Sequence, residues 1–291
     1  MKTSSALLSV KKYGSLVKFA HTIFAMPFAL TAFLLALNEP GVSFSWILLL
    51  QILVCMVAAR NTSLGFNRYA DRKIDALNPR TALRDIPAGR VTEREAAVFC
   101  IVNGLVFVIT ALTINKLCFY LSFVALLFLC GYSYLKRFTW LCHFGVGASL
   151  CIAPAGAYIA VTGHLSPAVC LLSAVVFFWS SGFDIIYALS DEEIDRAQGL
   201  HSIPQRFGRR NAMIISIAVH LFDFVLVPMF VSTAGLGTVA WIGAGLFLAM
   251  LAYQHLIVSP TDLRRLDAAF FTSNGIASLI FAVAVYLDVL L

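Results

Sequence analysis

The chain has 291 residues, of which 60% are hydrophobic and only 12% are charged, with a formal net charge of +6. Soluble domains average about 45–50% apolar and about 25% charged residues, so the composition argues against a soluble globular enzyme, a disordered segment and a nucleic-acid-binding domain. It predicts an all-α, polytopic membrane protein that is surrounded by lipid.

The predicted elements begin with a basic segment, 1–15, which we expect to lie as a helix on the membrane surface. A helix that crosses a bilayer needs roughly 20 mostly apolar residues. Nine such stretches follow along the chain: 19–37, 45–66, 96–114, 117–135, 140–162, 167–190, 211–231, 236–258 and 268–288. We therefore predict nine transmembrane helices in a single integral membrane domain that spans 1–291.

Lys and Arg gather on one side of the predicted membrane. With nine spans, the N-terminus and the loops after the second, fourth, sixth and eighth helices share a side. All 21 Lys and Arg except Lys116 are counted on that side, including Arg60 near the end of the second stretch. The positive-inside rule then places the N-terminus in the cytoplasm and the C-terminus outside, in a bacterial-type inner membrane.

Carboxylates follow the second and sixth predicted helices at matching spacings. The first motif reads Asn67-x-x-x-Asp71-x-x-x-Asp75, and the second reads Tyr187-x-x-x-Asp191-x-x-x-Asp195, preceded by Asp184. Residues four apart share a helical face, where like charges repel unless a cation lies between them. We predict a Mg²⁺ site, because Mg²⁺ binds one or two carboxylates together with substrate phosphates. Solvated helix ends without chemistry are the alternative.

The two motifs lie at an offset of 120 residues, because positions 67, 71 and 75 match 187, 191 and 195. This register suggests two related halves, 16–135 and 136–291. The match is short, so duplication and coincidence both stay open.

Basic residues lie beside these carboxylates, and Arg72 and Lys73 lie inside the first motif. Cations next to Mg²⁺ are typical of a site for a polyanion such as diphosphate, although topology anchors are the alternative. Near the end of the fourth predicted helix, Tyr132 and Lys136 share a face and Arg137 follows. An interfacial aromatic belt with basic neighbours is the alternative interpretation of this third motif.

The six histidines have no metal-ligand spacing, and we expect structural roles for most of them. His220 and Asp223 are three residues apart in the seventh predicted helix and are expected to pair with each other.

In combination, the three motifs resemble those of the UbiA superfamily of intramembrane aromatic prenyltransferases. That superfamily carries N-D-x-x-D-x-x-x-D after helix 2 and D-x-x-Y-x-x-x-D-x-x-x-D after helix 6. This chain matches both patterns except that Arg68 replaces the Asp that follows Asn67. The resemblance implies a nine-helix bundle around a central cavity that opens laterally to lipid and is capped by cytoplasmic loops.

The segments 136–139 and 199–204 are most similar to the 4-hydroxybenzoate polyprenyltransferase branch. This implies Mg²⁺-dependent transfer of a polyprenyl group from polyprenyl diphosphate to a ring carbon of 4-hydroxybenzoate, in ubiquinone-type quinone biosynthesis. The Arg68 form also resembles members associated with menaquinone made by the futalosine route, whose acceptor would be a dihydroxynaphthoate. A cation-coupled transporter is a third alternative, but it would place its carboxylates near the bilayer midplane.

The resemblance also implies roles for individual residues. The expected Mg²⁺ ligands are Asp71, Asp75, Asp191 and Asp195. Asn67 is expected to act in catalysis by orienting a metal ligand or the diphosphate. Substrate contacts are expected from Arg68, Arg72, Lys73, Lys136 and Asp184. Tyr132 and Tyr187 are expected to stabilise an allylic cation by cation–π contact, and Arg137 to bind the carboxylate of the acceptor. For the base that removes the ring proton, Asp191 and a phosphate oxygen both stay open.

Overall fold

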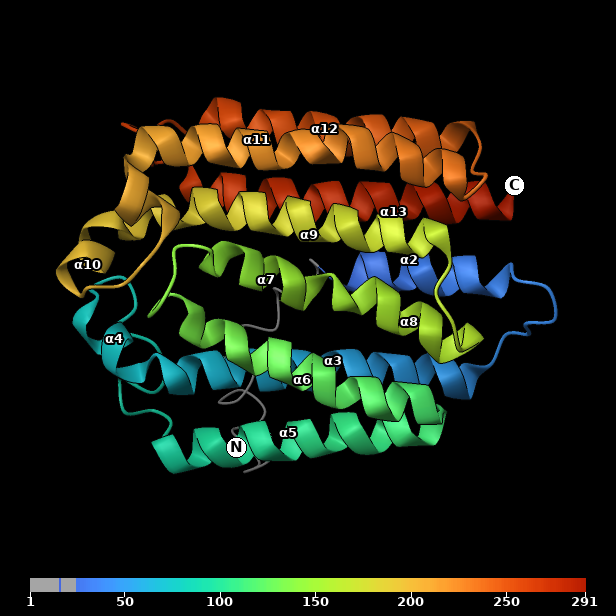
Figure 1. The fold of residues 1–291 in the computed structure, drawn as a ribbon, viewed down its shortest axis with the longest axis horizontal. Helices are drawn as coiled ribbons and strands as arrows, with labels where there is room; N and C mark the ends of the chain where they lie inside the picture. Colours follow the sequence, from blue (N-terminus) through green and yellow to red (C-terminus); the bar gives the residue numbers. More distant parts are fainter. Residues whose placement is uncertain (1–15, 17–24) are drawn as a thin grey trace, which may run out of the picture. The chain divides into compact units, whose positions relative to one another are not determined.

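The computed structural model describes Leu16 and residues 25–291 (Figure 1). Regular structure in these residues is helical, apart from one isolated bridge between Ser259 and Asp262. Eight of the described helices are long and apolar enough to cross a membrane, and Met26–Leu37 is a shorter apolar helix. These nine correspond to the nine predicted stretches, which confirms an all-α, multi-pass membrane protein. The predicted helix 1–15 and residues 19–24 of the first stretch lie outside the described residues.

The chain divides into two compact units. The first unit contains Leu50–Tyr134, and the second contains Ile23–Leu49 and Leu135–Leu291. Helices of the first unit are α3 (Trp46–Ala70, from Leu50 on), α4 (Arg72–Leu77), α5 (Glu93–Ile114) and α6 (Lys116–Leu135).

Polar side chains join the helices of the first unit inside their apolar surroundings. Asn61 Nδ2 in α3 donates to Asn103 Oδ1 in α5 at 3.0 Å. Ser63 Oγ in α3 donates to the carbonyl of Leu129 in α6 at 2.9 Å. Such bonds between helices help to hold transmembrane bundles together, because lipid offers these groups no other partner.

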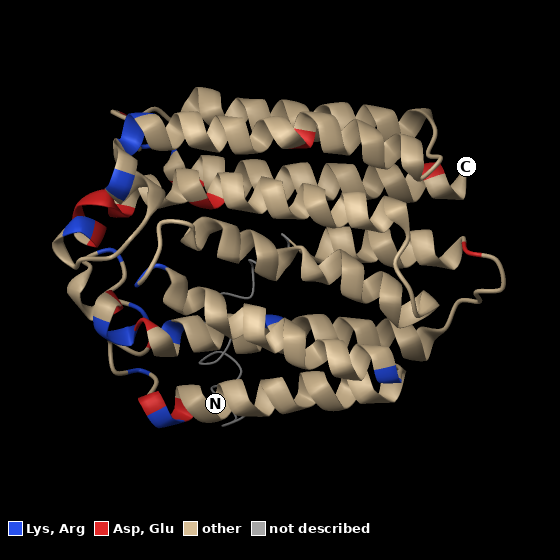
Figure 2. Cartoon of the chain, viewed as in Figure 1, with Lys and Arg blue, Asp and Glu red and all other residues tan. Residues whose placement is uncertain are grey.

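The second unit holds the remaining helices. They are α2 (Met26–Leu37), α7 (Cys142–Leu150), α8 (Ile152–Thr162), α9 (Pro167–Tyr187), α10 (Glu192–Ala197), α11 (Ile203–Thr233), α12 (Thr238–Ile257) and α13 (Asn274–Leu290). In this unit α9 packs against α7 and α11, α13 packs against α12 and α2, and α2 packs against α8. Within each unit the charged side chains lie mostly at the end where α4, or α10 and the start of α11, are found (Figure 2).

Two predicted stretches are interrupted in the structure, and a third helix is broken just before its predicted stretch begins. The fifth stretch divides at Cys151 into α7 and α8, where Pro154 has no N–H to donate to the carbonyl of Leu150. Gly208 breaks α11 with φ 78° and ψ 161°. The last stretch opens with a π-helical segment, Ala268–Ser273, before α13. Hydropathy predicts where a span lies but not these local changes of helix geometry.

Gly182 lets α9 and α11 approach closely. A Cβ atom at this position would lie 2.2 Å from His220 Nε2. In the same contact, Ser216 Oγ of α11 donates to the carbonyl of Gly182 at 2.8 Å. Small residues at such contacts are a common device of membrane helix packing.

His220 does not pair with Asp223, so that prediction was wrong. His220 Nε2 lies 3.1 Å from the carbonyl of Trp179, and His220 Nδ1 lies 2.8 Å from His255 Nε2. Asp223 is fully buried, and neither of its carboxylate oxygens has a hydrogen-bond partner among the described residues. The two ring nitrogens of His220 are thus engaged by the Trp179 carbonyl and by His255, not by the neighbouring carboxylate on α11.

We expect Gly182→Ala to lower the free energy of unfolding by about 1–3 kcal/mol, because the added methyl group overpacks the contact with His220. The measurement is thermal and denaturant unfolding of purified protein in detergent. Gly156→Ala in α8 is the matched control, since nothing lies within 4 Å of a Cβ there. Equal stability of the two variants would contradict the close contact.

Candidate functional site

The first acidic motif lies where α3 gives way to α4. Asp71 stands between the two helices with φ −91° and ψ 3°. Its N–H donates to the carbonyl of Asn67 at 2.9 Å, and the N–H of Asp75 donates to the carbonyl of Asp71 at 2.7 Å. The predicted four-residue helical spacing is therefore present across the junction.

Both aspartates of this motif are buried, with Asp71 2% exposed and Asp75 3% exposed. Asn67 Nδ2 donates to Asp71 Oδ2 at 3.2 Å, so the predicted neighbours do contact each other. Arg84 donates to Asp75 Oδ1 at 2.7 Å. The other oxygen, Asp75 Oδ2, is buried and has no hydrogen-bond partner in the part of the chain that the structure describes.

These two carboxylates fit a hard divalent cation. Carboxylate oxygens are the ligands that Mg²⁺ takes, and a buried oxygen without a hydrogen bond is one that a cation would satisfy. Among the described residues no group of three or more His, Cys, Asp or Glu is placed to hold a metal ion. A Mg²⁺ ion here would therefore need further ligands such as phosphate oxygens, as Mg²⁺ sites commonly have.

Arg72 turns away from the aspartates beside it. Its Nε lies 2.8 Å from the Glu93 carboxylate, and its guanidinium lies 4.5 Å from the centre of the Tyr69 ring. The Glu93 carboxylate raises the pKa of Arg72 above its ordinary value. In this structure Arg72 is thus engaged by protein groups, whereas the neighbouring Lys73 is exposed and Arg68 is half-buried at the end of α3.

The second acidic motif passes through three kinds of helix. Asp184 and Tyr187 belong to α9, Asp191 ends a 3₁₀ segment, Ala188–Asp191, and Asp195 lies in α10. A 3₁₀ helix has three residues per turn, so Asp191 is rotated from the face that a continuous α-helix would give it. Asp191 therefore does not lie on the same helical face as Tyr187 and Asp195, although the four-residue spacing predicts that it does.

Asp71 and Asp191 nevertheless share a backbone setting. Each is the residue that precedes a short helix, α4 and α10 respectively. Asp191 has φ −100° and ψ 0°, close to the values of Asp71, and neither side chain caps its helix. Both carboxylates are thus directed to something other than the backbone amides of the helix that follows.

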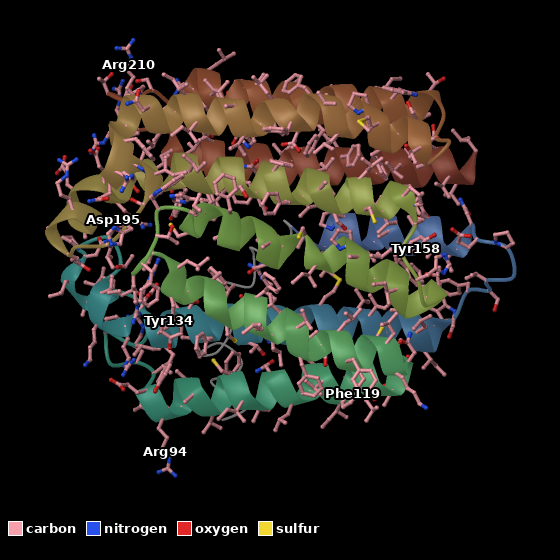
Figure 3. All side chains as sticks on the ribbon, in the orientation of Figure 1. Arg94, Phe119, Tyr134, Tyr158, Asp195 and Arg210 are labelled. Carbon is pink, nitrogen blue, oxygen red and sulfur yellow. The ribbon has the colours of Figure 1, made fainter. Side chains whose placement is uncertain are left out.

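Asp195 and Tyr187 are held by residues to which the sequence analysis assigned no individual role. Ser202 Oγ, at the start of α11, donates to Asp195 Oδ2 at 2.7 Å. The Tyr187 ring stacks on Phe270, with 4.1 Å between ring centroids. One face of the predicted cation–π ring is therefore covered by Phe270. Figure 3 labels Asp195 among the polar side chains near α10.

His143 is a further polar residue that sequence analysis missed. It is buried in α7, and its Nδ1 lies 2.7 Å from Asp184 Oδ2. Its other ring nitrogen, Nε2, accepts from the backbone N–H of Ile203 at 3.3 Å. The contact joins positions 41 residues apart, so no local sequence pattern could have indicated it.

The third motif extends from α6 into the following loop. Tyr132 lies in α6 of the first unit, next to Ser133, whose Oγ accepts from Asn67 Nδ2 at 3.4 Å. Lys136 and Arg137 begin the loop of the second unit, where the carbonyl of Lys136 accepts from the His201 N–H at 2.7 Å.

Arg60 lies inside α3, so counting it with the loop residues was wrong. It precedes Asn67 by seven residues, which puts the two side chains on the same helical face. Its Nε is buried and has no hydrogen-bond partner in the described residues. An arginine inside an apolar stretch is itself a sequence signal, because membrane helices retain ionisable residues mainly for function.

Comparison with known proteins adds independent findings. The UbiA prenyltransferase family model matches residues 25–275. A protein of Alkalilimnicola ehrlichii named 4-hydroxybenzoate octaprenyltransferase is 31% identical over 236 residues, which cover 80% of each chain. A protein of Serratia proteamaculans with the same name is 32% identical over 247 residues, covering 82% of this chain and 83% of the relative.

Solved structures agree with the sequence comparison. The apo structure of a UbiA homologue from Aeropyrum pernix has a TM-score of 0.81 and 29% identity, covering 92% of this chain and 98% of that one. A UbiA homologue from Archaeoglobus fulgidus, solved with DMAPP and Mg²⁺, has a TM-score of 0.75 and 20% identity, covering 96% of this chain and 99% of that one. At 20% identity, the similarity to the Archaeoglobus structure shows that the two chains share a fold.

We expect Arg84→Met to lower the free energy of unfolding by about 3 kcal/mol, because it leaves the buried Asp75 carboxylate without its cation. Adding Asp75→Asn to this variant should restore part of the loss. Unfolding in detergent without divalent metal measures both effects. Arg264→Met, which removes an exposed pair with Asp262, is the control and should leave the unfolding midpoint unchanged.

Proposed function

Since the chain belongs to the UbiA prenyltransferase family, we propose that it transfers a polyprenyl group from polyprenyl diphosphate to a ring carbon of 4-hydroxybenzoate. The prenyltransferase class follows from the family, and the names of the Alkalilimnicola and Serratia relatives support the acceptor. The observation that carries the site assignment is the buried Asp71–Asp75 pair, with one carboxylate oxygen that lacks a partner among the described residues.

The reaction is an electrophilic aromatic substitution. The bond between the prenyl carbon and the diphosphate oxygen breaks, a bond between that carbon and the ring forms, and the ring then loses a proton. Diphosphate and the prenylated acid are the products. For the proton acceptor, Asp191 and an oxygen of the departing diphosphate are both retained in this proposal.

The acidic motifs are proposed to hold the diphosphate through divalent metal. Asp71, Asp75, Asp191 and Asp195 are the proposed Mg²⁺ ligands, and a bound Mg²⁺ would neutralise charge on the leaving group. Asn67 would keep Asp71 oriented through the hydrogen bond between their side chains. The Mg²⁺ in the Archaeoglobus relative supports divalent metal in this fold.

Basic residues are proposed to bind the diphosphate oxygens. Lys73 is exposed beside the buried aspartates, and Arg68 takes the place of the acidic residue that follows Asn67 in the family motif. Lys136 is assigned the same task from the second unit. Arg72 would have to leave Glu93 in order to contact phosphate, so we propose that it contributes only in the substrate complex.

The allylic cation needs an electron-rich and dry environment. Tyr132 and Tyr187 are the proposed cation–π groups. Stacking on Phe270 fixes the plane of the Tyr187 ring, so the ring would lose little further entropy when the cation forms. Asp184 is proposed to contribute to the substrate site from the same turn of α9.

Two arginines are candidates for the carboxylate of the acceptor. Arg137 is the one that the third motif indicates. Arg60 is the second, because its buried Nε lies on the face of α3 that carries Asn67 and has no hydrogen-bond partner among the described residues. A planar carboxylate would match the fork of donors of this guanidinium.

A dihydroxynaphthoate acceptor, as in menaquinone biosynthesis by the futalosine route, is the second candidate. Arg68 is the observation that favours it, since it departs from the Asn-Asp pair of the family motif. The two acceptors share a carboxylate and a ring hydroxyl and differ in ring number. They are therefore distinguished by the mass of the product.

The organisation of the chain is also part of the proposal. We propose one integral membrane domain over 1–291, with its acidic motifs and N-terminus in the cytoplasm and its C-terminus outside. The asymmetry of Lys and Arg supports this orientation. The similar backbone setting of Asp71 and Asp191 supports related halves, 16–135 and 136–291.

The function is tested with purified protein, Mg²⁺, a polyprenyl diphosphate and equal amounts of the two acceptors, with products identified by mass spectrometry. We expect the prenylated benzoate to dominate. Asp71→Asn and Asp191→Asn should each lower kcat by about three orders of magnitude with folding retained, because metal charge stabilisation is worth several kcal/mol. Full activity of either variant, or activity in excess EDTA, would contradict the metal assignment.

The KM for 4-hydroxybenzoate distinguishes which of the two arginines binds the carboxylate of this substrate. Arg60→Met should raise the KM for 4-hydroxybenzoate by about 10–100-fold if Arg60 binds the carboxylate, because a hydrogen bond to a charged group contributes about 1.5–3 kcal/mol. The KM for the diphosphate should not change. Arg137→Met is the matched variant, and the larger acceptor effect identifies the residue. Equal turnover of the methyl ester and the acid by wild-type protein would exclude both residues.

A further inference from the structure

The second acidic motif is connected through a buried histidine to the start of α11. His143 is 3% exposed, and both of its ring nitrogens are engaged. Nδ1 lies 2.7 Å from Asp184 Oδ2, and Nε2 lies 3.3 Å from the backbone nitrogen of Ile203. All three residues belong to the second unit, so the whole contact lies within one compact part of the protein.

The two contacts determine where the histidine carries its proton. A backbone N–H can only donate, so Nε2 must accept and cannot carry a hydrogen atom. A neutral imidazole then has its hydrogen on Nδ1, where it donates to the Asp184 carboxylate. His143 thus uses Nδ1 as a donor to Asp184 and Nε2 as an acceptor from Ile203.

Ser202, at the start of α11, connects the His143 contact to Asp195. Ser202 directly precedes Ile203 and caps α11, accepting from the Gln205 N–H at 3.3 Å. The hydrogen of the same hydroxyl group is given to Asp195 Oδ2 at 2.7 Å. Ser202 is 3% exposed, so water cannot readily replace it in this contact. The position of the Ile203 backbone therefore fixes the donor that orients Asp195.

We propose that His143 is a positioning residue that links Asp184 to Asp195, 11 residues apart in the second acidic motif, through the first turn of α11. Its Nδ1–H orients the Asp184 carboxylate, and its Nε2 anchors the Ile203 N–H so that Ser202 stays on Asp195. The inference rests on the proposed function, because it assigns Asp195 to Mg²⁺ and Asp184 to the substrate. The ligand that this arrangement serves is a Mg²⁺–diphosphate.

Two conservative variants distinguish the contact that Nδ1 makes with Asp184 from the contact that Nε2 makes with Ile203. His143→Asn keeps a short amide donor for Asp184 but loses the acceptor for Ile203, whereas His143→Gln keeps a more distant acceptor and loses the short donor. We expect His143→Asn to raise the Mg²⁺ concentration needed for half-maximal effect by about tenfold, as is typical when a residue behind a metal ligand is lost. His143→Gln should instead raise the KM for polyprenyl diphosphate and leave the Mg²⁺ requirement unchanged.

The Mg²⁺ requirement is measured without turnover as the rise in melting temperature on adding Mg²⁺ together with a non-reactive prenyl diphosphate analogue. Ser202→Ala should shift this curve in the same direction as His143→Asn. The double variant should shift it little further, because both changes act through the same contact. His220→Leu is the matched control: it removes an equally buried histidine of the same unit, so it should lower the melting temperature and leave the Mg²⁺ curve in place.

The proton position is measured separately by nitrogen NMR of protein labelled at its histidine rings, with the His143 signal identified from its absence in His143→Gln. We expect a protonated Nδ1 and an unprotonated Nε2. A proton on Nε2, or wild-type Mg²⁺ curves in His143→Asn and Ser202→Ala, would overturn the inference. Wild-type protein that shows these results but transfers no prenyl group would contradict the proposed function and leave the positioning role intact.

Discussion

A charge removed from water must find a partner, because an unpaired buried carboxylate costs several kcal/mol or more. Only 12% of the residues are charged in a chain built of apolar helices, so this constraint applies to each buried charge. Asp75 forms an ion pair with Arg84, and Asp184 contacts the imidazole of His143. Asp75 Oδ2 is left without a hydrogen bond among the described residues, and it belongs to the same motif as the buried Asp71, so a metal ion would satisfy it there.

Helix ends leave backbone groups with the same need for partners, and the acidic motifs lie at such ends. A membrane helix satisfies its own N–H and C=O groups along its length but not in its first and last turns. Both acidic motifs lie at such ends, where α3 passes into α4 and where α9 passes through a 3₁₀ segment into α10. Asp71 and Asp191 occupy equivalent positions at these junctions, and their side chains are not used for capping.

The second motif shows how a site depends on residues that carry no motif of their own. Asp195 is oriented by Ser202, and Asp184 by His143, while the Ile203 backbone connects the two contacts. Tyr187 is fixed by its stacking on Phe270. A substitution at any of these supporting positions would move a carboxylate or a ring without touching the acidic motif itself.

The sequence by itself determined the membrane class, the nine apolar stretches and the acidic motifs, because hydropathy and four-residue spacing depend on composition and on local helix geometry. It did not determine the partners of His220 and His143, which depend on contacts between helices far apart in the chain. The breaks at Cys151 and Gly208 and the placement of Arg60 inside α3 are local features that hydropathy does not resolve. Helix packing determines which backbone segment lies next to which side chain, and Gly182 lies next to His220 in this way. A buried polar group then forms its hydrogen bonds with the partners that this packing brings within reach.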